Sequence, residues 1–91
     1  MLYMVIGRFR RGLRHDAGTS EADRAITETP DVTRIGSWVD ATLGRSFQVV
    51  ECDNILSLQQ WAARWRHRVE LEIVPVVSAR DAVVALEPLL G

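Results

Sequence analysis

The segment from Leu2 to Phe9 is the feature that most restricts the fold of this chain. It is rich in β-branched and aromatic side chains, a composition typical of a β-strand. Alternate side chains of a strand point to opposite faces, and here both faces are apolar. The two faces carry Leu2, Met4 and Ile6, and Tyr3, Val5 and Phe9. We therefore expect this strand to lie in the centre of a sheet, covered on both sides.

The remaining segments alternate between strand and helix patterns. Further strands are predicted at Val32 to Asp40, Ser46 to Cys52 and Val69 to Val77. Helices are predicted at Thr19 to Glu28, Asp53 to about Arg66, and Ser78 to Pro88. Asp53 and Ser78 are residue types that cap helices, and Pro88 is expected to stop the last one. We expect part of residues 10–30 to be mobile, because that segment has little apolar periodicity.

The second and third strands are expected to form a hairpin around a loop at residues 41–44. The register that this loop sets pairs Trp38 with Phe47, Ser37 with Gln48, and Arg34 with Glu51. An aromatic pair and an opposite-charge pair in one register support each other, because cross-strand pairs stabilise sheets.

The predicted order is β-α-β-β-α-β followed by a C-terminal helix. This is the order of the ferredoxin-like α+β fold, with an antiparallel sheet of strand order 4-1-3-2. Two helices cover only one face of such a sheet, yet both faces carry large apolar residues. We therefore expect a homodimer, in which a second copy covers the other face.

Composition excludes several classes of protein. The 91 residues fit a single domain over residues 1–91, and 11 Lys+Arg against 12 Asp+Glu argue against a nucleic-acid partner. No apolar run approaches the roughly 18 residues of a membrane span, so no membrane partner is expected. The single cysteine does not indicate an oxidising compartment, and we expect a cytoplasmic protein.

Six short motifs resemble a bacterial family of small proteins of unknown function. They are Met1-Leu2-Tyr3-Met4-Val5-Ile6, Ser37-Trp38-Val39, Ser46-Phe47-Gln48, Glu51-Cys52-Asp53, Trp61-Ala62-Ala63-Arg64-Trp65 and Glu72-Ile73-Val74-Pro75-Val76. That family is similar to the dimeric α/β-barrel superfamily, which includes muconolactone isomerases and antibiotic-biosynthesis-type monooxygenases. The resemblance spans residues 1–9 and 32–87 and implies a dimeric α/β barrel; it implies an activity only by analogy.

Two departures from the family pattern affect the ligand class. Gly7 stands where the resemblance leads us to expect an acidic residue at the end of the first strand. Residues 10–30 do not match the longer, Arg-rich amphipathic helix of the family. If that helix forms a pocket wall in relatives, the pocket of this chain is altered.

The strands carry most of the candidate ligand-binding residues. Arg34 and Glu51 are candidates for an anion contact and a general base, although we favour a surface salt bridge. Tyr3, Trp38 and Phe47 are candidates for an aromatic pocket wall, although aromatic strand residues more often belong to a core or a dimer interface.

Ser37 and Gln48 are the more informative pair. Polar side chains on an apolar sheet face require partners when they are buried, and a small organic ligand or a water molecule can supply them.

The remaining chemical groups favour structural roles. His67, in Arg64-Trp65-Arg66-His67-Arg68, is a candidate base or phosphate contact, but a cation near a helix C-terminus is the simpler interpretation. Cys52 is interpreted as a packed thiol. One cysteine and two scattered histidines show no metal-ligand spacing, and we expect neither a metal site nor a cofactor.

Two functions remain in competition, and the sequence does not decide whether the protein is an enzyme. The first is a homodimeric small-molecule-binding protein or cofactor-independent enzyme, isomerase-like or monooxygenase-like by analogy. The second is a non-catalytic interaction or regulatory module that works as a dimer. RNA binding ranks lower: Tyr3 and Phe47 are on suitable strands, but the net charge is −1.

Overall fold

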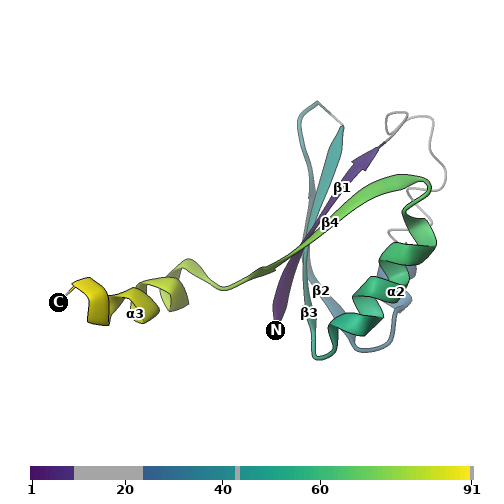
Figure 1. Ribbon diagram of the computed structural model, residues 1–91. Coiled ribbons are helices and arrows are strands. Elements are labelled where there is room, and N and C mark those ends of the chain that lie inside the picture. Colours follow the sequence, from purple (N-terminus) through teal and green to yellow (C-terminus); the bar gives the residue numbers. More distant parts are fainter. Residues whose placement is uncertain (10–23, 43, 91) are drawn as a thin grey trace.

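A computed structural model describes residues 1–9, 24–42 and 44–90 (Figure 1). The elements are β1 (Leu2–Phe9), β2 (Val32–Val39), β3 (Arg45–Cys52), α2 (Ile55–Trp65), β4 (Val69–Val76) and α3 (Ala79–Leu90). Residues 24–28 are helical, which agrees with the second half of the helix predicted there. Its first half, and residues 10–23 of the segment 10–30 in which we expect mobility, lie outside the described residues.

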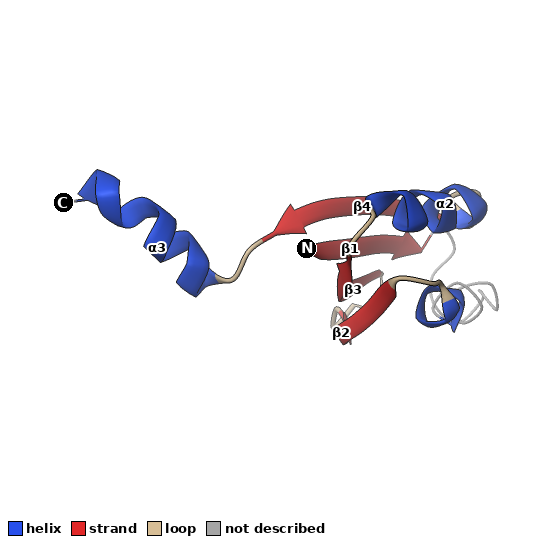
Figure 2. Cartoon of the chain, turned by 90° about the horizontal axis from the view of Figure 1, so that it is seen from below, coloured by secondary structure: helices blue, strands red, loops and turns tan. Residues whose placement is uncertain are grey.

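The strands form one antiparallel sheet in the order β2-β3-β1-β4. This confirms the predicted order, with β1 in the interior and β4, which contains Glu70, Glu72 and Pro75, at an edge. Helix α2 and the helical residues 24–28 lie on the same side of the sheet, as Figure 2 shows. The result is an α+β arrangement of the ferredoxin-like type in which one sheet face is covered.

The core lies between the sheet and these two helical segments. The strands contribute Tyr3, Val5, Val32, Val50 and Cys52, and the helical segments contribute Ile26, Leu58 and Trp61. In α2 the inward residues recur every three or four positions, as the predicted amphipathic helix requires. Packing against this stripe explains why only one face of β1 is buried within a single chain.

A β-bulge corrects the predicted hairpin register. The pairs Trp38–Phe47 and Ser37–Gln48 are confirmed. The register shifts between Arg34 and Gly36, and beyond this point Arg34 lies opposite Val50 and Glu51 lies opposite Thr33. The predicted Arg34–Glu51 cross-strand pair was therefore wrong, because the bulge places one extra residue in β2.

The loop of this hairpin is organised by Asp40. Its carboxylate accepts hydrogen bonds from the backbone N–H and the hydroxyl of Thr42, and it pairs with Arg45 at 3.1 Å. The hydrogen bond from the Thr42 hydroxyl, with a smaller contribution from Arg45, lowers the pKa of Asp40 to about 2. These contacts define the turn between β2 and β3.

Two helix ends differ from the prediction. Asn54 rather than Asp53 caps α2, because its side-chain oxygen accepts a hydrogen bond from the Leu56 N–H at 3.0 Å. Pro88 does not stop α3, which continues to Leu90. A proline has no backbone N–H, so it removes one backbone hydrogen bond from the helix, and the last turn of α3 accommodates that loss. Ser78 caps α3 as predicted, with its hydroxyl oxygen 3.0 Å from the Asp81 N–H.

Candidate functional site

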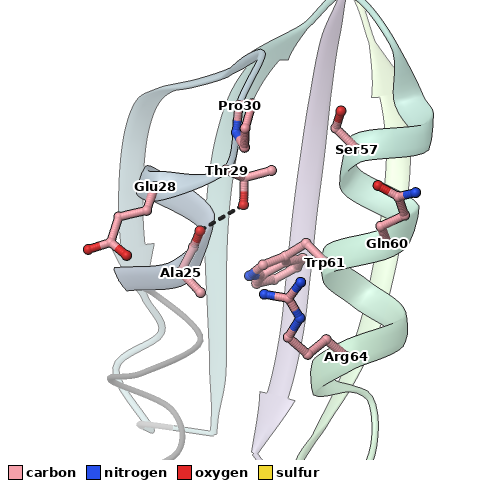
Figure 3. A pocket seen from close by; sticks show the side chains of 8 residues that line it. All are labelled: Ala25, Glu28, Thr29, Pro30, Ser57, Gln60, Trp61 and Arg64. Atoms are coloured by element: carbon pink, nitrogen blue, oxygen red, sulfur yellow. Dashed lines mark hydrogen bonds between the residues drawn. The ribbon is translucent and has the colours of Figure 1, made fainter.

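A groove of about 430 Å³ separates the helical residues 24–28 from α2 (Figure 3). It is lined by Ala25, Glu28, Thr29, Pro30, Ser57, Gln60, Trp61 and Arg64. The volume is in the range of small-molecule sites, which run from about 300 to 1,000 Å³. The groove is therefore large enough for a small organic ligand.

The floor and one wall of the groove are rigid parts of the fold. Trp61 belongs to the core and is only 3% exposed, so its indole gives the groove an aromatic floor. The opposite wall ends at Thr29, whose hydroxyl donates a hydrogen bond of 2.7 Å to the Ala25 carbonyl. Pro30 follows directly and ends the helical segment.

The rim of the groove is polar and carries both signs of charge. Arg64 and Gln60 project from α2, whereas Glu28, on the opposite helical segment, directs its carboxylate away from Trp61 and α2 (Figure 3). A guanidinium group binds carboxylates and other planar anions well, and an amide side chain can both donate and accept hydrogen bonds. An apolar floor below a few polar groups is the usual pattern of a small-molecule site.

Gln48 is a second polar feature on the helix-covered side of the sheet. Its side chain is only 5% exposed, and its Oε1 atom has no hydrogen-bond partner among the residues that the structure describes. The Nε1 atom of Trp65, at the end of α2, is also buried and has no partner in the described part of the chain. Buried polar atoms are nearly always satisfied in native proteins. These two atoms are therefore places where a water molecule or a ligand would gain a hydrogen bond.

The structure distributes the predicted site residues over two sheet faces. The register places Tyr3 and Gln48 on the helix-covered face, where both are buried. Trp38 pairs with Phe47 on the opposite face. The three aromatic residues Tyr3, Trp38 and Phe47 therefore do not line one cavity, and Tyr3 and Phe47 do not form a common stacking surface for RNA.

The other predicted site residues are exposed. Arg34, Ser37 and Glu51 lie on β2 and β3, and His67 follows the end of α2 in the turn before β4. None of the predicted residues lines the groove. Sequence reasoning missed its residues, although Trp61 and Arg64 carried a signal: they lie one helical turn apart in a motif that the family resemblance had singled out.

Cys52 confirms the interpretation as a packed thiol. The side chain is buried, and its Sγ donates to the Asn54 carbonyl at 2.9 Å, with the Asp31 carboxylate at 3.8 Å. Burial raises the pKa of the Cys52 thiol, and the charge of Asp31 adds to the effect. Such a thiol is a poor nucleophile. Among the described residues, no group of three or more His, Cys, Asp or Glu side chains is arranged to hold a metal ion.

A family model for a domain of unknown function, DUF3303, matches residues 1–90. The chain belongs to the DUF3303 family. A comparison with curated proteins finds no match. The crystal structure of SCO4226 from Streptomyces coelicolor A3(2) is similar with a TM-score of 0.53 and 20% sequence identity, covering 86% of this chain and 100% of that one.

These comparisons bear on family and fold. At 20% identity the likeness to SCO4226 supports the α+β architecture and nothing about activity. No helix among the residues that the structure describes combines the length and apolar character needed to cross a membrane.

Proposed function

We propose that this DUF3303 protein binds a small organic molecule in the groove between residues 24–28 and α2, and that it works in the cytoplasm as a homodimer. The observation that carries the proposal is the aromatic floor of Trp61 beneath a rim that contains Arg64 and Gln60. This arrangement suits a ligand with an apolar or aromatic body and an anionic group directed at Arg64.

The homodimer is supported by the uncovered face of the sheet. Met4 of β1 lies between Val49 of β3 and Val74 of β4 on that face, and all three are only partly buried. Contiguous exposed apolar surface of this kind normally marks an interface. A second copy of the chain offers exposed apolar surface that can cover this face.

A cofactor-independent isomerase or monooxygenase is the catalytic form of the proposal, by analogy with the superfamily resemblance. Its substrate would be a small aromatic or lactone-like molecule, with Glu28 as the carboxylate that receives a proton. Glu28 is exposed to water, whereas catalytic bases are usually held in desolvated sites. We therefore favour binding over catalysis at the groove.

NMR titration with benzoate, phenylacetate and a small lactone tests the binding site. The indole N–H signals of the three tryptophans report on different places: Trp61 on the groove, Trp65 beside it and Trp38 on the other sheet face. We expect saturable shifts of Trp61 with at least one probe and no shift of Trp38. Shifts of Trp38 alone, or of no tryptophan at millimolar probe, would contradict the proposal.

Gln60 and Gln59 provide a matched pair of variants for the same titration. Both residues are exposed on α2, but only Gln60 lines the groove. Gln60→Phe places a ring at the rim and is expected to weaken binding at least tenfold. Gln59→Phe is expected to leave the affinity unchanged. Equal effects of the two variants would place the binding site elsewhere.

A non-catalytic interaction module that works as a dimer is the alternative. It is favoured by the exposed apolar residues of α3, which include Val83, Leu86 and Leu89. In that case the dimer forms, but none of the small probes perturbs Trp61. The same NMR experiment therefore separates the two functions.

A further inference from the structure

Helix α3 stands apart from the rest of the molecule. Both views place it away from the sheet and on the side opposite to α2 (Figures 1 and 2). The connection of Val77 and Ser78 continues the direction of β4 instead of turning back. The chain measures 52 × 30 × 18 Å, with a radius of gyration of 14.9 Å. A compact domain of this length has a radius of gyration of about 12 Å, so the arm that carries α3 extends the molecule.

The helix is amphipathic, although it shows no extensive packing against the other helices and strands that the structure describes. Helical spacing places five apolar residues in one stripe: Ala79, Ala82, Val83, Leu86 and Leu89. The opposite side carries Arg80, Asp81 and Glu87. An isolated helix of this length is marginal in water, and most helical stability in proteins comes from packing of the apolar face. This stripe therefore requires a partner surface.

The same side of the molecule contains the uncovered sheet face. The strand pairing places seven partly buried apolar residues on it: Leu2, Met4, Ile6, Phe47, Val49, Val74 and Val76. At one end of this face, Arg8 and Arg45 lie in the same row as Glu70. The face thus combines an apolar centre with charges of both signs, which is compatible with contact between identical chains.

The chain exposes more surface than a compact monomer of its mass, and burial of the excess in a dimer would account for the difference. The chain exposes 6371 Å². A compact monomer of 10.2 kDa is expected to expose about 5300 Å². The excess of about 1000 Å² is comparable to the roughly 800 Å² that each partner contributes to a standard stable interface.

The dimensions of helix and sheet also agree. A helix of 12 residues is about 18 Å long. Four strands at about 4.8 Å spacing give a sheet about 19 Å wide. Helix α3 is therefore long enough to cross the open face of a sheet such as the one in this chain.

We infer that α3 of one copy packs its apolar stripe on the open sheet face of a second copy, and that the two copies exchange these arms reciprocally. The inference rests on the proposed homodimer and specifies which element covers the sheet. The exchange buries both exposed apolar surfaces of each chain, the stripe of α3 and the open sheet face, in one type of contact.

A pair of variants on α3 tests the exchange. Leu86 lies in the apolar stripe and is 50% exposed, whereas Val84 lies on the opposite side of the same helix and is 58% exposed. Leu86→Glu and Val84→Glu thus make similar changes at similar starting exposure. Neither residue belongs to the core cluster, and both variants are expected to keep the far-UV circular dichroism of the sheet domain.

The dimer dissociation constant of each full-length variant is measured by sedimentation equilibrium. Leu86→Glu is expected to raise it about 100-fold, because two copies of the contact are lost and each costs about tenfold. Val84→Glu is expected to change it less than threefold. In mixed dimers of ¹³C-labelled and unlabelled chains, nuclear Overhauser contacts between Leu86 and the Met4 methyl of the other chain are expected.

The outcomes separate the inference from the proposal on which it rests. A wild-type dimer that neither variant weakens, without contacts between Leu86 and Met4 of the other chain, would overturn arm exchange and leave the homodimer intact. A wild-type chain that stays monomeric at about 100 µM would overturn both, because dimer formation depends on protomer concentration. Groove binding would stand or fall separately on the Trp61 titration.

Discussion

Replacing Gln48 by methionine should stabilise this protein. The Oε1 atom of Gln48 is buried, and no described residue, in 1–9, 24–42 or 44–90, gives it a hydrogen bond. Leaving such an atom unsatisfied costs about 1–3 kcal/mol of folding free energy. Methionine has nearly the same length and volume as glutamine and no strong hydrogen-bonding atom, so Gln48→Met removes that cost without opening a cavity.

We expect Gln48→Met to raise the free energy of unfolding by about 1–2 kcal/mol. For a domain of 91 residues, 1 kcal/mol corresponds to about 5 °C in Tm, so the expected rise is about 5–10 °C. Urea denaturation and calorimetry at one fixed protein concentration measure both quantities, because the proposed dimerisation would make stability depend on concentration.

Gln59→Met is the control for this measurement. Gln59 is exposed on α2, and methionine and glutamine have similar helix propensities, so the expected change is within about 0.5 kcal/mol. A loss of 1 kcal/mol or more in Gln48→Met alone would refute the reasoning. It would mean that Oε1 accepts a hydrogen bond in the native protein, from a bound water molecule, a ligand or a second copy.

Two further predictions concern Cys52 and Gly7. Burial raises the pKa of the Cys52 thiol above its ordinary value of 9.0, so the folded protein holds this proton at pH values where the unfolded chain has lost it. The free energy of unfolding should therefore fall as pH rises through 9. Cys52→Ala should lessen that fall in urea titrations between about pH 7 and 10.5. A Cβ atom at Gly7 would lie 2.9 Å from Ser46 Oγ and 3.1 Å from Val69 Cγ1, so Gly7→Ala should lower the free energy of unfolding by about 1–3 kcal/mol. At Gly44 the nearest neighbour of an added Cβ would be 3.6 Å away, so Gly44→Ala should change the free energy of unfolding little. Equal unfolding midpoints for these two glycine variants would contradict that steric argument.

The crowding at Gly7 also gives a physical account of a departure noted in the sequence. The family resemblance leads to an acidic residue at this position, but Ser46 and Val69 occupy the space that its side chain would need. Neighbouring side chains thus leave no room for a side chain at Gly7 in this protein. A carboxylate there would require both neighbours to move.

The local pattern of the sequence was sufficient for the elements and their order. Alternation and β-branched residues located all four strands to within one residue at either end, and the apolar spacing of Leu58, Trp61 and Trp65 located α2 and its inward face. The apolar faces of β1 placed it inside the sheet, and Glu70, Glu72 and Pro75 placed β4 at the edge. These features depend on residues close together in the chain, so their periodicity carries the information.

Tertiary structure decided the features that depend on distant segments. A bulge between Arg34 and Gly36 separated the predicted pair of Arg34 and Glu51, although the residues nearer the loop kept their register. No local pattern distinguishes a strand with such a bulge from a regular one, because the extra residue is accommodated by pairing with the neighbouring strand.

The candidate site shows the same division. Sequence alternation put Gln48 on a sheet face that also carries apolar residues, but only the packed helices decided that this face is the buried one. The groove joins residues 25–30 to residues 57–64, which meet only because both segments pack on the same side of the sheet. The sequence by itself therefore determined the elements, their order and the amphipathic faces, since these follow from side-chain periodicity. Only the tertiary structure decided the register beyond the bulge, the place of the groove and the isolation of α3, since these follow from contacts between segments far apart in the chain.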